Sequence, residues 1–325
     1  MLSALAIAYL FMGGAGAGAV ALLAASDLLS WCRRWLPPRR APSASRDARA
    51  PRDAVCRAPN AFRDDPCSSA NFNSSHPLFA PGMAVATATL GLAAFCLLAD
   101  LGRTDRALIL FTRPTFSPVT VGTYALALLV ICSLALILLA NATQPPPRWA
   151  ALVRRGLSVV VAVAALLVML YTGLLFFSIG TGTLLGSLLL PTLFVLSSLS
   201  TGNALLLAVS YLLNLPFWGD RLFRLDSAII ALELLCLTVF LITAACDPLR
   251  AASFSTLTQG PYATLFWMGA VLCGLVAPLV LESRRFARRV ASGVNLALPV
   301  ALLVFTGGVC LRYSVLGAAL PVPAA

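Results

Sequence analysis

Long apolar runs separated by polar connections make up most of the chain. Eight runs come close to the roughly 20 residues that an α-helix needs to cross a bilayer. The pattern predicts an all-α, polytopic membrane protein. The first run lacks a preceding basic segment and is too long for a signal peptide, so we expect it to be retained. The eight predicted transmembrane helices are 2–29, 82–101, 119–140, 156–178, 184–210, 227–246, 262–282 and 294–318.

The connection between the second and third runs, residues 100–124, carries an unusual number of charges for its position. Pro114 and Pro118 lack amide donors and disfavour helix in the residue before them, so we expect an extended, shaped cap over a site. Arg103 and Arg106 can pair with Asp100 and Asp105 or dock a partner protein, and both readings stay open. The charged residues are Asp100, Arg103, Asp105, Arg106 and Arg113.

Composition supports a membrane location. Of the 325 residues, 60% are hydrophobic and 11% are charged, which is more apolar than a soluble core can absorb. The net charge is +11, and every basic residue is Arg. Because these Arg residues lie largely in connections, membrane topology and anionic lipid headgroups explain them, and we expect no nucleic-acid partner.

The distribution of Arg predicts the orientation. The connections after the first, third, fifth and seventh runs hold 18 Arg, nine of them in the long connection 30–81, whereas the remaining connections and chain ends hold five. The side of a membrane protein with more Arg and Lys faces the cytoplasm. We therefore expect an Arg-rich cytoplasmic loop over 30–81 and both termini outside the cytoplasm.

Cysteine and histidine usage argues against a resident metal centre. The nine Cys form no C-x-x-C pair, whereas structural zinc and iron–sulfur centres need four clustered ligands. His76 is the only histidine, so a haem held by two imidazoles is excluded. We expect no metal, haem or iron–sulfur cluster in this chain.

Polar groups of the first four runs converge near the predicted outer surface. Tyr9 and Tyr171 each lie about seven residues from that surface, roughly 10 Å deep at 1.5 Å per residue. Asp100, Ser117 and Tyr124 lie where the second run ends and the third begins. These groups predict an outer pocket, although a tyrosine at this depth also fits an interfacial aromatic belt.

Glycines are dense in the first run. Gly14 and Gly18 lie four residues apart, a spacing that lets helix backbones approach closely in lipid. Helix packing is one interpretation, and space for a flat ligand is the other.

The second half offers fewer polar groups. Glu233 lies seven residues into the sixth run, roughly 10 Å from the predicted cytoplasmic surface. Asn203 is expected at a comparable depth, near several Ser and Thr. These groups predict either a proton path or helix–helix hydrogen bonds. Asp27 and Glu282 lie at helix ends, where we expect solvated charges.

Several segments, taken in order, resemble the NrfD/PsrC family, the membrane subunits of polysulfide-reductase-like complexes. The resemblance covers nearly all spans. The matching segments are the Gly-rich 11–18, Asp100-Leu-Gly-Arg103, Arg113-Pro-Thr-Phe-Ser-Pro118, Tyr171-Thr-Gly, 190–202 and 307–313. The long connection 30–81 and Thr104 depart from the family pattern.

The resemblance implies two four-helix halves, residues 1–178 and 179–325, in a bacterial or archaeal plasma membrane. It implies docking to a ferredoxin-like 4Fe-4S subunit, for which Arg103, Arg106 and Arg113 are the candidates, often with a molybdopterin catalytic subunit beyond. It also implies a menaquinone or ubiquinone site in the first half, with Tyr171 bonding a quinone carbonyl. The candidate quinone-binding residues are Tyr171, Tyr9, Gly14, Gly18, Asp100, Ser117 and Tyr124.

Two other functions remain open. A secondary transporter often has broken helices and polar groups near the midplane, and Pro191, Asn203 and Glu233 could serve those roles. Against it, the densest polar cluster lies in the connection 100–124. A purely structural membrane anchor is the third possibility.

Overall fold

The computed structural model describes residues 4–35, 77–100, 118–142, 148–179, 183–288 and 294–319. These residues are helical, with no strand among them. Eight helices are long and apolar enough to span a membrane, which confirms the predicted all-α class and number of spans. The helices are α1 (Ala4–Trp35), α2 (Phe79–Asp100), α4 (Pro118–Ala142), α5 (Arg148–Ile179), α6 (Leu189–Leu212), α7 (Pro216–Cys246), α8 (Ala251–Thr258), α9 (Ala277–Arg288) and α10 (Val294–Ala319), with a short 3-10 turn η1 (Leu184–Gly186) and a π-helical segment η2 (Leu265–Val276) that continues into α9.

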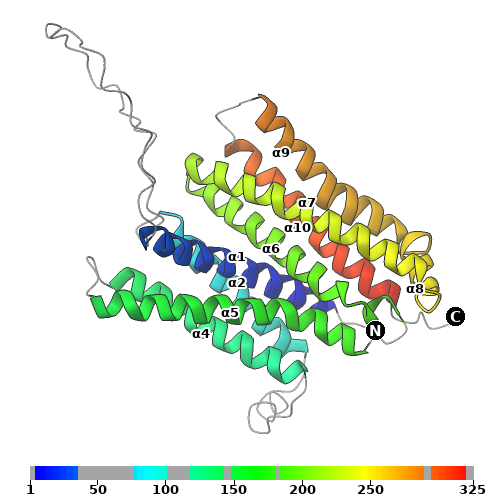
Figure 1. Ribbon diagram of the computed structural model, residues 1–325, viewed down its shortest axis with the longest axis horizontal. Coiled ribbons are helices and arrows are strands. Elements are labelled where there is room, and N and C mark those ends of the chain that lie inside the picture. Colours follow the sequence, from blue (N-terminus) through cyan, green and yellow to red (C-terminus); the bar gives the residue numbers. More distant parts are fainter. Residues whose placement is uncertain are drawn as a thin grey trace, which may run out of the picture.

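The spanning helices lie side by side along one common direction (Figure 1). Successive spans alternate in direction, so α1 begins and α10 ends at the same end of the bundle. We call the end where α2 stops at Asp100 and α4 starts at Pro118 the 100–118 end. The opposite end, where α1 stops and α2 starts, is the 30–78 end.

Helices α1 and α6 form the centre of the bundle. The apolar windows of α1 and α6 are 61% and 67% buried, compared with 28% for both α2 and α7. The contact between α1 and α6 is more extensive than that between α6 and α7. Because the central contact crosses the boundary between the two predicted four-helix halves, the division at residue 178 stays a prediction.

Glycines allow this central contact. A Cβ at Gly18 would overlap the backbone carbonyl of Ser198, and a Cβ at Gly202 would overlap the backbone of Gly18 and Ala19. Gly274 of η2 and Gly307 of α10 meet in the same way in the second half. Without a hydrophobic driving force between helices in lipid, such close backbone approach is what holds helices together.

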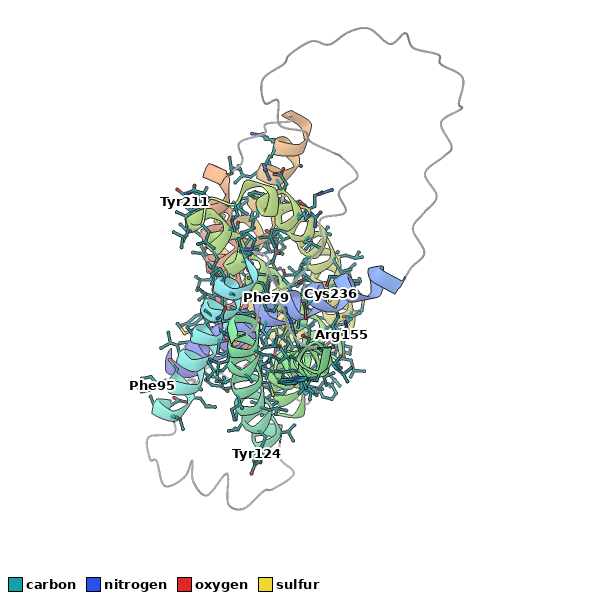
Figure 2. The ribbon with its side chains drawn as sticks, turned by 90° about the vertical axis from the view of Figure 1, so that its left-hand side faces the viewer. Phe79, Phe95, Tyr124, Arg155, Tyr211 and Cys236 are labelled. Atoms are coloured by element: carbon teal, nitrogen blue, oxygen red, sulfur yellow. The ribbon has the colours of Figure 1, made fainter. Side chains whose placement is uncertain are left out.

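The outer helices present large apolar side chains to the surroundings. Phe95 of α2 is 67% exposed and Ile131 of α4 is 66% exposed, and Figure 2 shows Phe95 on the outer face of its helix. In water such a surface would be an aggregation site. In a membrane it is solvated by lipid tails, which is the environment that the composition predicts.

Two helix starts differ from the sequence prediction. Helix α7 begins at Pro216, eleven residues before the predicted start at 227, because Pro is favoured at the first helical position. Helix α6 begins at Leu189, so Pro191 lies in its first turn and does not break it. The earlier start of α7 brings Asp226 into a membrane helix.

Candidate functional site

Two tyrosines from different helices meet near the 100–118 end. Tyr9 of α1 and Tyr171 of α5 are hydrogen-bond neighbours through their hydroxyl groups, and both side chains pack on the apolar core. The exposed carboxyl group of Asp100, at the end of α2, acts electrostatically on Tyr9. The structure therefore brings together three of the predicted site residues. We call these three residues the tyrosine site.

Glycines hold the Tyr171 ring in place. The ring lies against Gly122 of α4, where any Cβ would overlap it. Gly173, two residues along α5, lies on the backbone of Pro191 in α6. The side chain of Thr172 is turned away, since its hydroxyl donates to the Met169 carbonyl at 2.9 Å. Close contacts of α5 with α4, through the Tyr171 ring, and with α6, through Gly173, thus flank the tyrosine.

The other residues predicted for this site are placed differently. Tyr124 is 39% exposed and lies at the edge of the bundle (Figure 2). Gly14 lies against the side chains of Ser198 and Arg312, and Gly18 lies on α6, so both glycines serve helix packing at these contacts. The remaining four, Ser117, Arg103, Arg106 and Arg113, lie outside the described residues.

An arginine occupies the core of the bundle. Arg312 of α10 is 2% exposed. Its guanidinium group donates to the hydroxyl of Ser198 at 3.0 Å and to the carbonyl of Gly308 at 3.2 Å. It also lies over the rings of Phe11, at 5.6 Å, and Phe194, at 5.9 Å. Because Phe11 belongs to α1, this arginine joins the two predicted halves.

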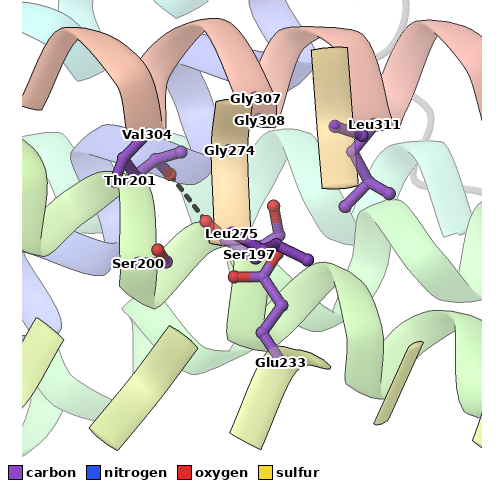
Figure 3. A pocket seen from close by; sticks show the side chains of 11 residues that line it. Ser197, Ser200, Thr201, Glu233, Gly274, Leu275, Val304, Gly307, Gly308 and Leu311 are labelled. Atoms are coloured by element: carbon purple, nitrogen blue, oxygen red, sulfur yellow. Dashed lines mark hydrogen bonds between the residues drawn. The ribbon is translucent and has the colours of Figure 1, made fainter. Parts of the chain in front are cut away.

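Glu233 of α7 provides the opposite charge. It is buried and interacts electrostatically with Arg312. The hydroxyl groups of Ser197 and Ser200 lie beside its carboxyl group (Figure 3). Glu233 lies at the middle of the Gly219–Cys246 span, whereas the sequence prediction placed it roughly 10 Å from one surface; the earlier start of α7 explains the difference.

A small cavity adjoins Glu233 between α6, α7, η2 and α10. About 10 Å³ of it is open to the centre of a water molecule, which is close to the space that one water needs. Apart from the Glu233 carboxyl group beside them, the Ser197 and Ser200 hydroxyls have no hydrogen-bond partner within the described part of the chain. A one-water space therefore lies at mid-membrane depth, with a mostly apolar lining into which four polar side chains project, those of Ser197, Ser200, Thr201 and Glu233.

A third cluster of polar side chains lies nearer the 30–78 end. The amide nitrogen of Asn203 donates to the Asp226 carboxyl group at 2.9 Å and to the Leu222 carbonyl at 3.1 Å. Ser227 donates to the carboxyl group of Glu282 on α9. Asp226 and Glu282 are both fully buried, so the expectation of a solvated Glu282 was wrong.

Asp27 was also expected to be solvated, and the structure pairs it instead. Arg154 of α5 donates to one carboxylate oxygen at 3.0 Å, and Ser158 donates to the other at 2.9 Å. The Arg154 guanidinium lies 5.0 Å from the ring centroid of Phe79 in α2. These contacts tie α1, α2 and α5 together at the 30–78 end.

Sequence reasoning missed Asp226 and Arg312 as buried charges. Asp226 fell just outside the predicted sixth span, and Arg312 was counted with the chain end although it lies inside α10. Moving Arg312 into the membrane changes the Arg count from 18 against five to 18 against four. The signal that could have found both is an ionisable residue flanked by apolar residues at helical spacing.

Side chains that could bind a metal are scattered over the bundle. Within the described ranges, no three His, Cys, Asp or Glu side chains cluster to hold a metal ion. Cys56, Cys67 and His76 lie outside those ranges. The expected absence of a metal centre therefore stays a prediction.

Comparison with known proteins gives two findings. The family model described as polysulphide reductase, NrfD, matches residues 67–324. The C subunit of the polysulfide reductase of Wolinella succinogenes is 29% identical over 172 residues, which cover 50% of this chain and 53% of that protein. The chain thus matches about half the length of this curated relative. Because the family model covers most of the chain and eight helices can span a membrane, the chain is a multi-pass membrane protein that belongs to the polysulphide reductase NrfD family.

Proposed function

We propose that this chain is the membrane anchor and quinone-reacting subunit of a reductase complex, and that its quinone site is the tyrosine site at the 100–118 end. The observation that carries the proposal is the contact between Tyr9 and Tyr171 beside Asp100. Family membership and the curated relative, a polysulfide reductase subunit, support the complex.

The tyrosine site suits a quinone head group, which is flat and apolar with two carbonyl oxygens. When bound, menaquinone or ubiquinone exchanges two electrons and two protons. A phenol can donate a hydrogen bond to a carbonyl without the cost of burying a charge. The Tyr171 hydroxyl can turn from Tyr9 to a ligand carbonyl while its ring stays on Gly122, and exposed Asp100 can pass a proton to water.

The electron partner is expected at the same end of the bundle. We propose a ferredoxin-like 4Fe-4S subunit there, with a molybdopterin catalytic subunit beyond, held by Arg103, Arg106 and Arg113. Guanidinium groups suit this role because they bind carboxylates in a bidentate fork. The orientation inferred from Arg counting places this end outside the cytoplasm.

The test is Tyr171→Phe in the assembled complex. Quinol-dependent turnover is compared with turnover driven by an artificial donor to the iron–sulfur partner. Loss of the first with the second retained supports the site, because the ring remains and only the hydroxyl is lost. If the ratio of quinol-dependent to artificial-donor turnover is the same in Tyr171→Phe and wild type, the quinone binds outside the tyrosine site.

A second function is supported by the cavity next to Glu233. We propose a proton path through the second half that uses Glu233 and Asn203. The one-water space and the Ser197 and Ser200 hydroxyls beside Glu233 support it, since a water there can connect hydroxyls to a carboxylate.

Ser200→Val tests this path without changing a charge, because it fills the cavity with methyl groups. Proton movement in vesicles driven by quinol oxidation should fall while quinol-dependent electron transfer is retained. Thr192→Val, an exposed position on the same helix, is the matched control. Unchanged proton movement in Ser200→Val would leave these residues with a packing role only.

A further inference from the structure

Two carboxyl groups from different helices meet inside the bundle near the 30–78 end. Asp226 of α7 and Glu282 of α9 are hydrogen-bond neighbours, and neither is exposed. One oxygen of each carboxyl group already accepts a hydrogen bond. Asn203 donates to Asp226 at 2.9 Å, and Ser227 donates to Glu282. The two remaining oxygens, Oδ2 of Asp226 and Oε1 of Glu282, have no donor among the described residues.

Two carboxylates cannot face each other through these oxygens without a hydrogen between them. Both oxygens would be acceptors, and like charges in contact disfavour the ionised form of one group. A single proton turns one group into a donor and the other into its acceptor. The unpartnered oxygens are then satisfied by each other, as buried polar groups in proteins generally are.

The charges around the Asp226–Glu282 pair also favour a single bound proton. Arg285 of α9 acts electrostatically on Glu282 and reaches outward to the half-exposed Asp220. Deeper along α7, Glu233 has its own counter-charge in Arg312. Arg285, whose side chain is 9% exposed, therefore supplies one counter-charge for two buried carboxyl groups. An unpaired buried charge is costly, and one bound proton removes the excess negative charge.

We propose that Asp226 and Glu282 form a proton-binding site that holds one proton between Oδ2 of Asp226 and Oε1 of Glu282. The site lies at the end of the second half opposite the tyrosine site. It does not depend on quinone binding, since every residue in it belongs to α6, α7 and α9.

The Asp226–Glu282 site lies between the 30–78 end and the cavity beside Glu233, a position that suits proton transfer. Asp226 and Glu233 are seven residues apart on α7, which puts them on one face of the helix and about 10 Å apart. Asn203, bonded to Asp226, belongs to the same helix as the cavity-lining Ser200. A proton taken from the 30–78 end is thus held two helical turns from the mid-membrane cavity.

Infrared spectroscopy of the full chain in lipid nanodiscs, with any subunits that co-purify, tests the site at neutral pH. A protonated carboxyl group has a C=O stretch that shifts on transfer to D2O, whereas a carboxylate has none in that region. Wild type should show this band. Asp226→Asn and Glu282→Gln should each lose it, because the remaining carboxylate is balanced by Arg285 and receives a hydrogen bond from the new amide.

Two controls separate this pair from other carboxyl groups. Asp247→Asn removes a partly exposed carboxylate paired with Arg250 and should retain the band. The charge-balanced double variant Glu233→Gln/Arg312→Met should also retain it. If wild type lacks the band, or if the band persists in a folded Asp226→Asn or Glu282→Gln protein, the proposal is wrong. Loss of the band in Glu233→Gln/Arg312→Met, with the band retained in Asp226→Asn and Glu282→Gln, would place the proton on Glu233. That result would also overturn the proposal.

Discussion

Gly202 of α6 lies directly on the backbone of Gly18 in α1, so closely that no side chain fits at either position. The two residues are far apart in sequence and belong to different predicted halves. Their contact makes α1 and α6 a single central unit, which carries Tyr9 on α1 and Asn203, the partner of Asp226, on α6.

Gly18→Ala and Gly202→Ala should each destabilise the protein. The added methyl group overlaps backbone atoms that cannot rotate away, so the helices must separate, at a typical overpacking cost of about 1–3 kcal/mol. Thermal unfolding in lipid nanodiscs should show a lower Tm. Gly91→Ala and Gly156→Ala are matched controls, since nothing lies within 4 Å of a Cβ at either position. An unchanged Tm in both core variants would show that the helices are not in backbone contact.

Gly122→Ala should weaken the quinone reaction without removing any polar group. The methyl group would overlap the Tyr171 ring and move its hydroxyl away from Tyr9. If one hydrogen bond is lost, worth about 0.5–1.5 kcal/mol, quinol-dependent kcat/KM should fall roughly 2- to 10-fold. Turnover with an artificial donor to the iron–sulfur partner should be unchanged. Gly91→Ala on neighbouring α2 is the control; a fall in both activities for Gly122→Ala would indicate general misfolding instead.

Arg312 and Glu233 should be strongly coupled in stability. Arg312→Met leaves Glu233 as an uncompensated buried charge, and Glu233→Gln does the same to Arg312, each at a cost of about 3–5 kcal/mol. The double variant should recover most of that loss, because both charges are then gone. Denaturant unfolding of all four proteins gives the coupling free energy. Additive losses in the double variant would contradict the electrostatic coupling of Arg312 and Glu233.

Single-cysteine variants should report the orientation. We expect Cys56 and Cys67 to be labelled by an impermeant reagent only after permeabilisation, since Arg counting places 30–81 in the cytoplasm. Cys246, exposed at the 100–118 end of α7, should be labelled in intact cells. The opposite labelling pattern would reverse the predicted orientation, together with the expected side of the docking partner.

The number and type of helices could be read from the sequence because hydrophobic length alone decides them. Helix ends were less certain, and the misplaced start of α7 is instructive. Residues 216–226 contain Asp220, Arg221, Arg224 and Asp226, so their hydropathy is that of a loop. They are helical because Pro216 starts a helix, and Asp226 is buried because Asn203 and Glu282 surround it.

The candidate site was predictable only in part. Depth along each helix predicted that Tyr9 and Tyr171 lie at one level, and the structure brings them together. Which faces meet depends on helix rotation, which a nearly uniform apolar pattern does not reveal. For that reason Gly14 and Gly18 could not be assigned to α6, nor Arg312 to Glu233, before the packing was known.

The central position of α1 and α6 has a consequence for biosynthesis. Helix α1 leaves the ribosome before its most buried partner, α6, which ends at Leu212. Until then the glycine face of α1 lacks the helix that covers it. Contacts between such distant segments form late, so the core closes only after α6 is in the membrane. A nascent chain that stops before α6 therefore leaves α1 half-covered, a state that quality control in the membrane can recognise.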